Sequence, residues 1–291
     1  MRDILDCFPE RDKECEITFE CNPEDITTEY VVWLFLLWIN RLSIWVQSLN
    51  NETLKAIYRS DETSILGALN AVHEAIDRTN KVWISLNIDF ILGLPHVERW
   101  ETLEDIQRLR KNFPYITHTS VYMLEKWLYP KSWKNHTLDE ESLQDEYLEI
   151  MEYFESIGWN HYELSNWAHP WYESRHNQSY WNHSATRGFW LSAASYVWWE
   201  RYSNSDSFSG YYKWVKTWEE TLSPEQVAIE ELMFWLRTSG SYDIGNHYME
   251  LNQMKIQEFI SKWLITQESN TIKLTKTWIF LIDYIMSELI S

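Results

Sequence analysis

Several polar side chains stand at or near the ends of predicted β-strands, where together they could bind one small ligand. A carboxylate accepts hydrogen bonds from hydroxyl or ammonium groups, and an arginine can pair with a carboxylate through two parallel hydrogen bonds. The alternative is that each residue is an ordinary solvated strand end. Their placement on one shared rim makes a binding site for a small ligand with hydroxyl, amine and carboxylate groups as good an interpretation as that alternative. The set comprises Glu20, Asn22, Gln47, Asp89 and Glu125, with Arg59 contributed by the helix after the second strand.

A second group of chemically active side chains lies within one short stretch, at His176, Asn177, Tyr180 and Trp181. An imidazole can ligate iron, and the neighbouring aromatic rings could stack on a flat macrocycle. The alternative is a packed, hydrogen-bonded interior histidine. The stretch by itself does not choose between these two interpretations.

Predicted strands and helices alternate through the first part of the chain, and this order positions the first group. The segment Arg41–Ser48 reads as a short buried strand, because Leu42, Ile44 and Val46 alternate with other residues and polar residues follow. Alternating strands and helices predict parallel strands joined by crossover helices. In α/β barrels of this kind the chemistry sits at the carboxyl ends of the strands. The predicted strands are 15–21, 41–48, 84–92, 116–124 and 159–165, and the predicted helices are 24–39, 50–59, 62–80, 102–111 and 138–157.

The pattern changes after residue 165. Residues 166–219 are aromatic and irregular, and we interpret them as a connecting region. Residues 220–291 read as a small helical domain. It opens with Ser223 as helix N-cap and Pro224 at the first helical position, and it contains a short strand at 271–275 before a final amphipathic helix. The sequence thus predicts three parts, with residues 1–165 as the first.

Composition narrows the functional classes. The chain has 291 residues and a net charge of −19, which argues against binding to a nucleic-acid backbone. No apolar signal segment opens the sequence, and the apolar run at 31–39 is too short to cross a bilayer. We therefore expect a cytoplasmic protein with no transmembrane segment. An odd cysteine count of 3 does not predict a disulfide framework.

Glycine and tryptophan occur in abnormal numbers. A usual glycine share would give about 20 residues, but the chain has 7 glycines and 19 tryptophans. Several tryptophans stand where the backbone favours glycine, such as Trp38 after a predicted helix, Trp198 and Trp199 in a predicted turn, and Trp263 at a helix end. One hypothesis explains both anomalies: UGA codons that the host reads as glycine have been translated as tryptophan. The alternative is a protein that is truly rich in tryptophan.

Four motifs in order resemble radical S-adenosylmethionine (SAM) proteins of the oxygen-independent coproporphyrinogen III oxidase family. They are Glu20-x-Asn22-Pro23, Asn40-Arg41-Leu-Ser-Ile-x-Val-Gln47-Ser48, Asp89-x-Ile-x-Gly93-Leu-Pro95 and Ser120-Val121-Tyr122. Two further motifs look like the heme-chaperone (HemW-type) branch of that family, namely Tyr162-Glu163-Leu-Ser165-Asn166 and His176-Asn177-x-x-Tyr180-Trp181. The resemblance implies an α/β fold: a partial radical SAM (TIM-like) barrel followed by a small, mostly helical C-terminal domain.

The resemblance also implies cofactors and roles. Positions that hold SAM in the family correspond to Glu20, Gln47, Arg59 and Asp89, and the motif linked to heme corresponds to His176, Asn177, Tyr180 and Trp181. The implied cofactors are SAM, a [4Fe-4S] cluster and heme, and the implied partners are heme or a porphyrin and a heme-acceptor protein. The favoured function is a heme chaperone. The alternatives are the oxidase itself, which decarboxylates propionates of coproporphyrinogen III, and an inactive fragment.

The chain departs from the family in two respects. The three cluster-binding cysteines of the family, spaced C-x3-C-x2-C, are absent, and Cys7, Cys15 and Cys21 are separated by seven and five residues instead. We therefore expect an N-terminally truncated chain that cannot assemble the cluster or perform radical chemistry. A histidine found in many relatives is replaced by Ala194.

The resemblance bears on the tryptophans as well. The family has aromatic residues at Trp159, Trp167 and Trp181, whereas an indole at Trp45 would stand in the middle of the strand proposed to hold SAM. The family usually has glycine at the positions of Trp45, Trp171, Trp190, Trp198, Trp235 and Trp263.

Overall fold

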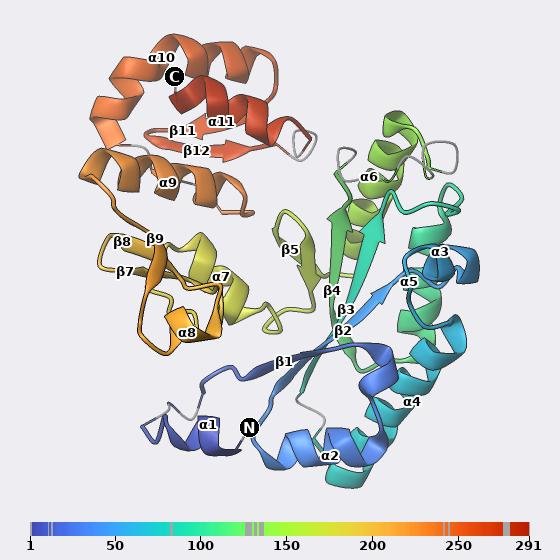
Figure 1. Ribbon diagram of the computed structural model, residues 1–291. Helices are drawn as coiled ribbons and strands as arrows, with labels where there is room; N and C mark the ends of the chain where they lie inside the picture. Colours follow the sequence, from blue (N-terminus) through green and yellow to red (C-terminus); the bar gives the residue numbers. More distant parts are fainter. Residues whose placement is uncertain are drawn as a thin grey trace. The chain divides into compact units, whose positions relative to one another are not determined.

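The computed structural model of the chain forms two compact units, which are described separately (Figure 1). The first, here called the sheet unit, comprises residues 1–161 and 165–173, and the second, the C-terminal unit, comprises residues 162–164 and 174–291. The three-part division expected from the sequence stays a prediction. The structure describes residues 2–10, 12, 14–81, 84–125, 130, 133, 137–240, 242–243, 245–275 and 280–290.

The sheet unit is built on a six-stranded sheet with the order β1-β2-β3-β4-β6-β5. The first four strands are parallel, and the register pairs Glu20 with Ser43 and Ser43 with Asn87. Leu42, Ile44 and the following valine alternate along β2 and are buried, so they share one face of the sheet. The strands are β1 (Thr18–Cys21), β2 (Arg41–Gln47), β3 (Ser85–Leu92), β4 (Ile116–Met123), β5 (Asn160–Glu163) and β6 (Asn166–Ala168).

Helices connect the parallel strands, and α3, α4 and α5 lie on the same side of the sheet (Figure 1). The ends of α4 show why the sequence forms a helix here: Asp61 accepts a hydrogen bond from the Ser64 N–H at the start, and Asn80 adopts φ 54° at the end. The helices of this unit are α1 (Arg2–Asp6), the 3₁₀ helix η1 (Pro23–Asp25), α2 (Thr28–Leu36), α3 (Asn51–Ala56), α4 (Glu62–Thr79), α5 (Glu101–Asn112) and α6 (Glu140–Ser156).

Three sequence-based expectations about this unit were wrong. The strand expected at 159–165 is β5, but a further strand, β6, follows it and pairs antiparallel with β4, so the sheet is not parallel throughout. The helix expected at 24–39 is interrupted after η1, because Thr27 caps a new helix by accepting from the Tyr30 N–H. The helix expected to reach Arg59 ends at Ala56.

The C-terminal unit contains two small sheets. Residues 166–219 are not irregular throughout, because β7, β8 and β9 form a three-stranded antiparallel sheet. The second sheet has the order β10-β12-β11 and accompanies three helices. The elements are α7 (Arg175–Trp181), β7 (Ala194–Val197), β8 (Glu200–Asn204), α8 (Phe208–Tyr211), β9 (Lys216–Thr221), α9 (Pro224–Leu236), β10 (Tyr242–Asp243), α10 (Gly245–Ser261), β11 (Ile265–Glu268), β12 (Thr271–Leu274) and α11 (Ile282–Ile290).

Helix α9 begins as the sequence predicts. The Ser223 side chain accepts from the Gln226 N–H, and the Gln226 side chain accepts in return from the Ser223 N–H, which together form a capping box. Leu232 and Leu236 of this helix join an apolar cluster with residues of α10 and α11, including Phe259 and Ile285. Among the described residues, no helix has the length and apolar character needed to cross a membrane.

Candidate functional site

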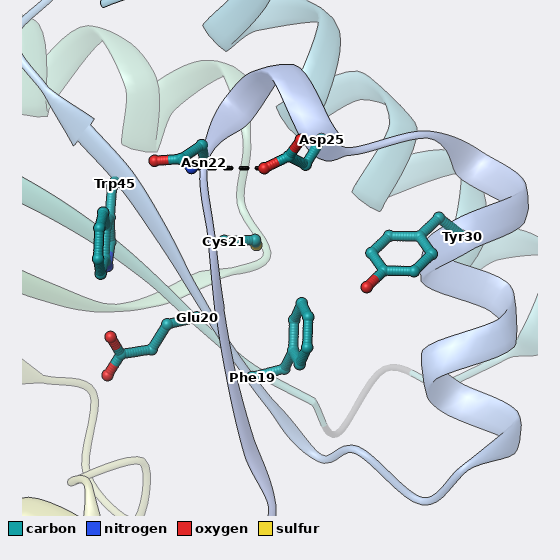
Figure 2. A pocket seen from close by; sticks show the side chains of 7 residues that line it. All are labelled: Phe19, Glu20, Cys21, Asn22, Asp25, Tyr30 and Trp45. Atoms are coloured by element: carbon teal, nitrogen blue, oxygen red, sulfur yellow. Dashed lines mark hydrogen bonds between the residues drawn. The ribbon is translucent and has the colours of Figure 1, made fainter. Parts of the chain in front are cut away.

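The first candidate site lies along β1, which stands at one end of the sheet order. A hollow of about 350 Å³ follows this strand. Figure 2 shows Glu20 and Trp45 on one side of β1 and Phe19 and Tyr30 on the other. The hollow is lined by Phe19, Glu20, Cys21, Asn22, Asp25, Tyr30 and Trp45. It therefore offers a carboxylate and an amide on the side that faces β2.

Three predicted site residues come together beside this hollow. The Arg59 guanidinium donates from Nε to Gln47 Oε1 over 2.9 Å, and from Nη1 to the Asn22 side-chain oxygen. Its Cζ lies 5.7 Å from the centre of the Trp45 ring. Asn22 and Trp45 also line the hollow with Glu20. Asn22, Gln47 and Arg59 thus meet at the carboxyl end of β1 and β2, and Glu20 lines the hollow beside them.

Local backbone geometry orients Arg59. Helix α3 ends early, and the hydrogen bond from the Arg59 N–H to the Leu54 carbonyl closes its last turn. Tyr58 takes φ 58° in that turn, so the chain reverses and Arg59 points back toward Gln47. Gln47 itself has φ 67° at the last position of β2. A turn rather than a helical face therefore places the guanidinium.

Asp89 lies elsewhere than expected. It stands within β3 rather than at its end, and it is buried. Its two carboxylate oxygens accept from Ser43 Oγ at 3.0 Å and from Asn87 Nδ2 at 2.6 Å. Because Glu20, Ser43 and Asn87 are neighbours in register, Asp89, two residues after Asn87, shares a sheet face with Glu20.

A buried polar network, unnoticed in the sequence, surrounds Asp89. Asn87 Nδ2 also donates to Ser120 Oγ at 3.1 Å, and His118 Nδ1 lies 2.6 Å from Asn87 Oδ1. Because an amide oxygen only accepts, His118 carries its proton on Nδ1. Burial, and then the Arg41 cation, lowers the pKa of His118 well below its ordinary value, so the ring is neutral. The sequence signal for this network was the polar residues spaced two apart within apolar strands, namely Asn87 and Asp89 in β3 and His118 and Ser120 in β4.

Burial also controls the charge on Asp89. Removal from water raises the pKa of this carboxyl, while hydrogen bonds from Ser120, Asn87 and Ser43 and the nearby Arg41 cation oppose the rise. Arg41 is buried, and its Nε has no hydrogen-bond partner. The network therefore holds a cation and an acid inside the sheet face.

The raised pKa of Asp89 predicts a pH effect on stability. Between its ordinary pKa of 3.8 and the raised value, the folded protein binds more protons than the unfolded chain, so stability falls as pH rises through that window. An Asp89→Asn variant keeps the side-chain shape and lacks this loss. Urea unfolding at several pH values should show that the free energy of unfolding of the variant, relative to that of the parent, increases as pH rises. His118 is present in both proteins, so its contribution cancels in this difference. Parallel curves would contradict the assignment.

The three cysteines do not form a cluster site. Cys7 is exposed, Cys15 is half-buried, and Cys21 is buried in β1. Burial, followed by the carboxylates of Asp25, Asp89 and Glu20, raises the pKa of the Cys21 thiol to about 12. Iron–sulfur clusters need thiolates, and among the described residues no three His, Cys, Asp or Glu side chains group to hold a metal. The residues present do not fit a [4Fe-4S] cluster.

This mismatch predicts the result of reconstitution. The 291-residue chain incubated anaerobically with iron and sulfide should yield no cluster that depends on its cysteines. The measurement is the visible absorption and iron content of the parent beside a Cys7→Ser/Cys15→Ser/Cys21→Ser variant. Equal iron in both proteins is expected. A cluster that the parent forms, that the variant lacks and that cleaves SAM would contradict the prediction.

The second candidate site lies in the C-terminal unit, on helix α7. Ser174 caps this helix by accepting from the Asn177 N–H at 3.2 Å. His176 and Tyr180, one turn apart, are exposed and meet edge to face with ring centres 4.9 Å apart. His176 is therefore not an interior histidine, and that alternative was wrong.

Trp181 occupies the inner side of α7. It is half-buried, its ring meets Phe234 of α9 edge to face at 6.1 Å, and its Nε1 is buried without a hydrogen-bond partner. His183, which follows the helix, stacks on Tyr196 at 4.1 Å and lies 3.3 Å from a Glu230 oxygen. The motif thus exposes a histidine and a tyrosine to solvent, while Trp181 packs against Phe234 on the inner side of the helix.

Comparison with known proteins shows a consistent likeness. The chain is 28% identical over 276 residues to the heme chaperone HemW of Lactococcus lactis, covering 89% of this chain and 71% of that protein. It is 28% identical over 245 residues to HemW of Synechocystis, and this match covers 78% of this chain and 57% of that protein. It is 30% identical over 169 residues to HemW of Escherichia coli, and this match covers 58% of this chain and 43% of that protein. No family model matches the chain.

The fold agrees with this likeness. A solved structure of the Escherichia coli coproporphyrinogen III oxidase HemN, described as a radical SAM enzyme, matches with a TM-score of 0.80 at 18% identity. The match covers 99% of this chain and 72% of that one, and it supports the predicted α/β partial barrel with a smaller second part. The chain is thus similar in sequence to HemW heme chaperones and in fold to a radical SAM enzyme.

Proposed function

We propose that this protein is a heme chaperone, which binds heme and transfers it to an acceptor protein. The observation that carries the proposal is the exposed His176–Tyr180 pair on α7, within the motif that this chain shares with its family. The relatives in Lactococcus lactis, Synechocystis and Escherichia coli are all heme chaperones by name. A chaperone needs an accessible ligand, because heme must enter and leave.

The chemistry of α7 suits a flat iron macrocycle. An exposed imidazole can ligate the heme iron through a ring nitrogen. Tyr180, 46% exposed, stands beside it and offers a ring face to the porphyrin. Asn177 and Trp181 lie on the neighbouring side of the helix, where Trp181 packs against Phe234 and fixes the helix orientation. In this proposal His176 is the ligand and Tyr180 the contact surface.

The residues beside β1 are proposed to bind SAM, which the family implies. SAM carries an amino-acid carboxylate, an ammonium group and ribose hydroxyls. The Arg59 fork suits the carboxylate, and Glu20 and Gln47 suit the ammonium and hydroxyl groups. Asp89 is proposed to act from the buried network on the same sheet face rather than at the rim. No cluster chemistry is assigned, because the cysteines of this chain do not fit it.

The alternative function is oxygen-independent oxidation of coproporphyrinogen III. One relative, the Helicobacter pylori coproporphyrinogen III oxidase, is 28% identical over 173 residues, covering 56% of this chain and 36% of that one. The chaperone relatives named above cover more of the chain, and this favours the chaperone. Loss of propionate carboxyl groups from coproporphyrinogen III in the presence of this protein would favour the oxidase instead.

Heme titration tests the proposal. Ferric heme added to the protein should produce a histidine-ligated absorption spectrum, and a His176→Ala variant should bind about tenfold more weakly, because one iron–imidazole bond is lost. His169→Ala is a matched control: His169 is likewise exposed and meets Tyr172 edge to face at 5.9 Å. Its spectrum and affinity should be unchanged.

Two outcomes would contradict the assignment. Equal heme spectra for the parent and His176→Ala would remove His176 as ligand. A loss on His183→Ala with none on His176→Ala would instead assign iron binding to the half-buried His183, which contacts Glu230.

A further inference from the structure

The backbone conformations of the tryptophans are abnormal. Three of the 19, Trp83, Trp127 and Trp278, lie outside the described residues, and eight of the others have φ between 53° and 93°. Only a few per cent of non-glycine residues adopt positive φ, and for a bulky residue it is an outlier. Seven other non-glycine residues of the described chain have positive φ, which is an ordinary rate. The excess is thus confined to tryptophan.

Helix ends give the first independent reason for this pattern. After α6, Gly158 at φ 75° donates to the Glu155 carbonyl, and the next N–H donates to the Phe154 carbonyl. This pair of bonds is the Schellman motif, in which glycine is favoured at the residue past the helix end. The same pair occurs after α2 with Trp38 at φ 69°, and after α10 with Trp263 at φ 58°. Trp38 and Trp263 thus occupy the position that Gly158 fills.

The turn between β7 and β8 gives the second reason. Val197 pairs with Glu200, which leaves a two-residue hairpin loop made of Trp198 and Trp199. Their φ values are 53° and 65°, so both central residues are in the left-handed region. Two-residue loops of this kind are built from Asn-Gly, Asp-Gly or Gly-Gly pairs. Two adjacent tryptophans are the reverse of this preference.

Exposure gives the third reason. Trp171 is 94% exposed, Trp198 90% and Trp263 80%, whereas Trp159 and Trp167, which have no positive φ, are buried. Large aromatic side chains normally contribute to cores and interfaces. Two populations therefore stand apart: Trp159 and Trp167, whose indoles are buried in packing, and the eight tryptophans whose backbone has the requirements of glycine.

We infer that the protein made by its host carries glycine at the eight tryptophan positions with positive φ, and tryptophan at Trp159 and Trp167. The backbone adds Trp100 and Trp214 to the positions that the sequence indicated, and it gives no positive φ for Trp45 or Trp235. The eight positions are Trp38, Trp100, Trp171, Trp190, Trp198, Trp199, Trp214 and Trp263.

The inference changes the surface of the C-terminal unit. Trp190 and Trp214 are exposed near Phe208, Tyr211 and Tyr212, and the Trp190 ring meets Phe208 at 5.6 Å. With tryptophan at both positions this surface resembles a large aromatic docking patch. With glycine at both positions it is much smaller. The aromatic surface around Trp190 and Trp214 is therefore no evidence for a protein-docking site.

Reading the gene and sequencing the host protein test the inference together. The eight positions should be encoded by TGA and the positions of Trp159 and Trp167 by TGG, and peptide mass spectrometry of the host protein should show glycine at the eight and tryptophan at the two. TGG codons at the eight positions, or TGA codons with tryptophan in the peptides, would overturn it. Glycine at position 167 would overturn the division into two populations.

A pair of recombinant substitutions tests the backbone argument separately. Trp38→Gly should unfold at a higher temperature than Trp38→Ala, because glycine relieves φ 69° while both variants lose the contact with Lys81. Trp33 is the matched control, since it is exposed, lies within α2 and has no positive φ. Trp33→Gly should unfold at a lower temperature than Trp33→Ala. The same sign at both positions would contradict the argument.

Discussion

Replacing Trp167 with alanine is expected to lower the free energy of unfolding of the sheet unit by about 3–5 kcal/mol, the range for truncating a buried large aromatic residue. The Trp167 side chain is fully buried in β6. Its ring stacks on His161 with centres 4.4 Å apart and on Phe154 at 5.4 Å. Alanine would leave a cavity between β6 and α6. Because Trp167 Nε1 is buried without a partner, the loss should fall in the lower part of that range.

Urea unfolding followed by circular dichroism measures this effect, with Trp171→Ala as the control. Trp171 lies only four residues further along and is 94% exposed, so its truncation should change stability by less than about 0.5 kcal/mol. The urea concentration at the unfolding midpoint should fall for Trp167→Ala and remain unchanged for Trp171→Ala. The dependence of the free energy of unfolding on urea concentration should not change in either variant. Equal effects of the two variants would show that Trp167 is not part of the core.

Replacing Arg59 with alanine is expected to weaken SAM binding by about ten- to a hundredfold. Hydrogen bonds to a charged group contribute about 1.5–3 kcal/mol, and each 1.4 kcal/mol is about a tenfold change in affinity. The loss has two sources. The ligand carboxylate loses its cationic partner, and Gln47 and Asn22 lose the donor that fixes their side chains.

Titration calorimetry with SAM measures this loss, and two further proteins sharpen the result. Arg59→Lys keeps the charge without the planar fork, so its affinity should lie between the parent and Arg59→Ala. Trp45→Gly removes the indole that lines the hollow beside Arg59, and it should bind more tightly than the parent. Absence of binding by both the parent and Trp45→Gly would contradict the assignment of this site to SAM.

The sequence alone determined the elements of the sheet unit with good accuracy. The expected strand at 41–48 is β2, and the expected helix at 62–80 is α4, within one residue at each end. Local signals suffice here, because hydrophobic alternation and capping residues such as Asp61 act over a few positions. The Ser223 cap of α9 was predicted for the same reason. The short motifs also predicted a likeness to HemW-type proteins, and the comparisons confirm this likeness.

The pairing of residues distant in sequence was decided only by the tertiary structure. The Arg59–Gln47 hydrogen bond depends on how α3 ends, and the antiparallel pairing of β6 depends on a reversal after Glu163. The network around Asp89 arises where β2, β3 and β4 bring side chains together that lie more than thirty residues apart. The sequence already marked Trp263 as a glycine-like position, whereas Trp100 and Trp214 were found only from their positive φ. Register and backbone reversal are set by the packing of whole elements, so no local pattern could specify them.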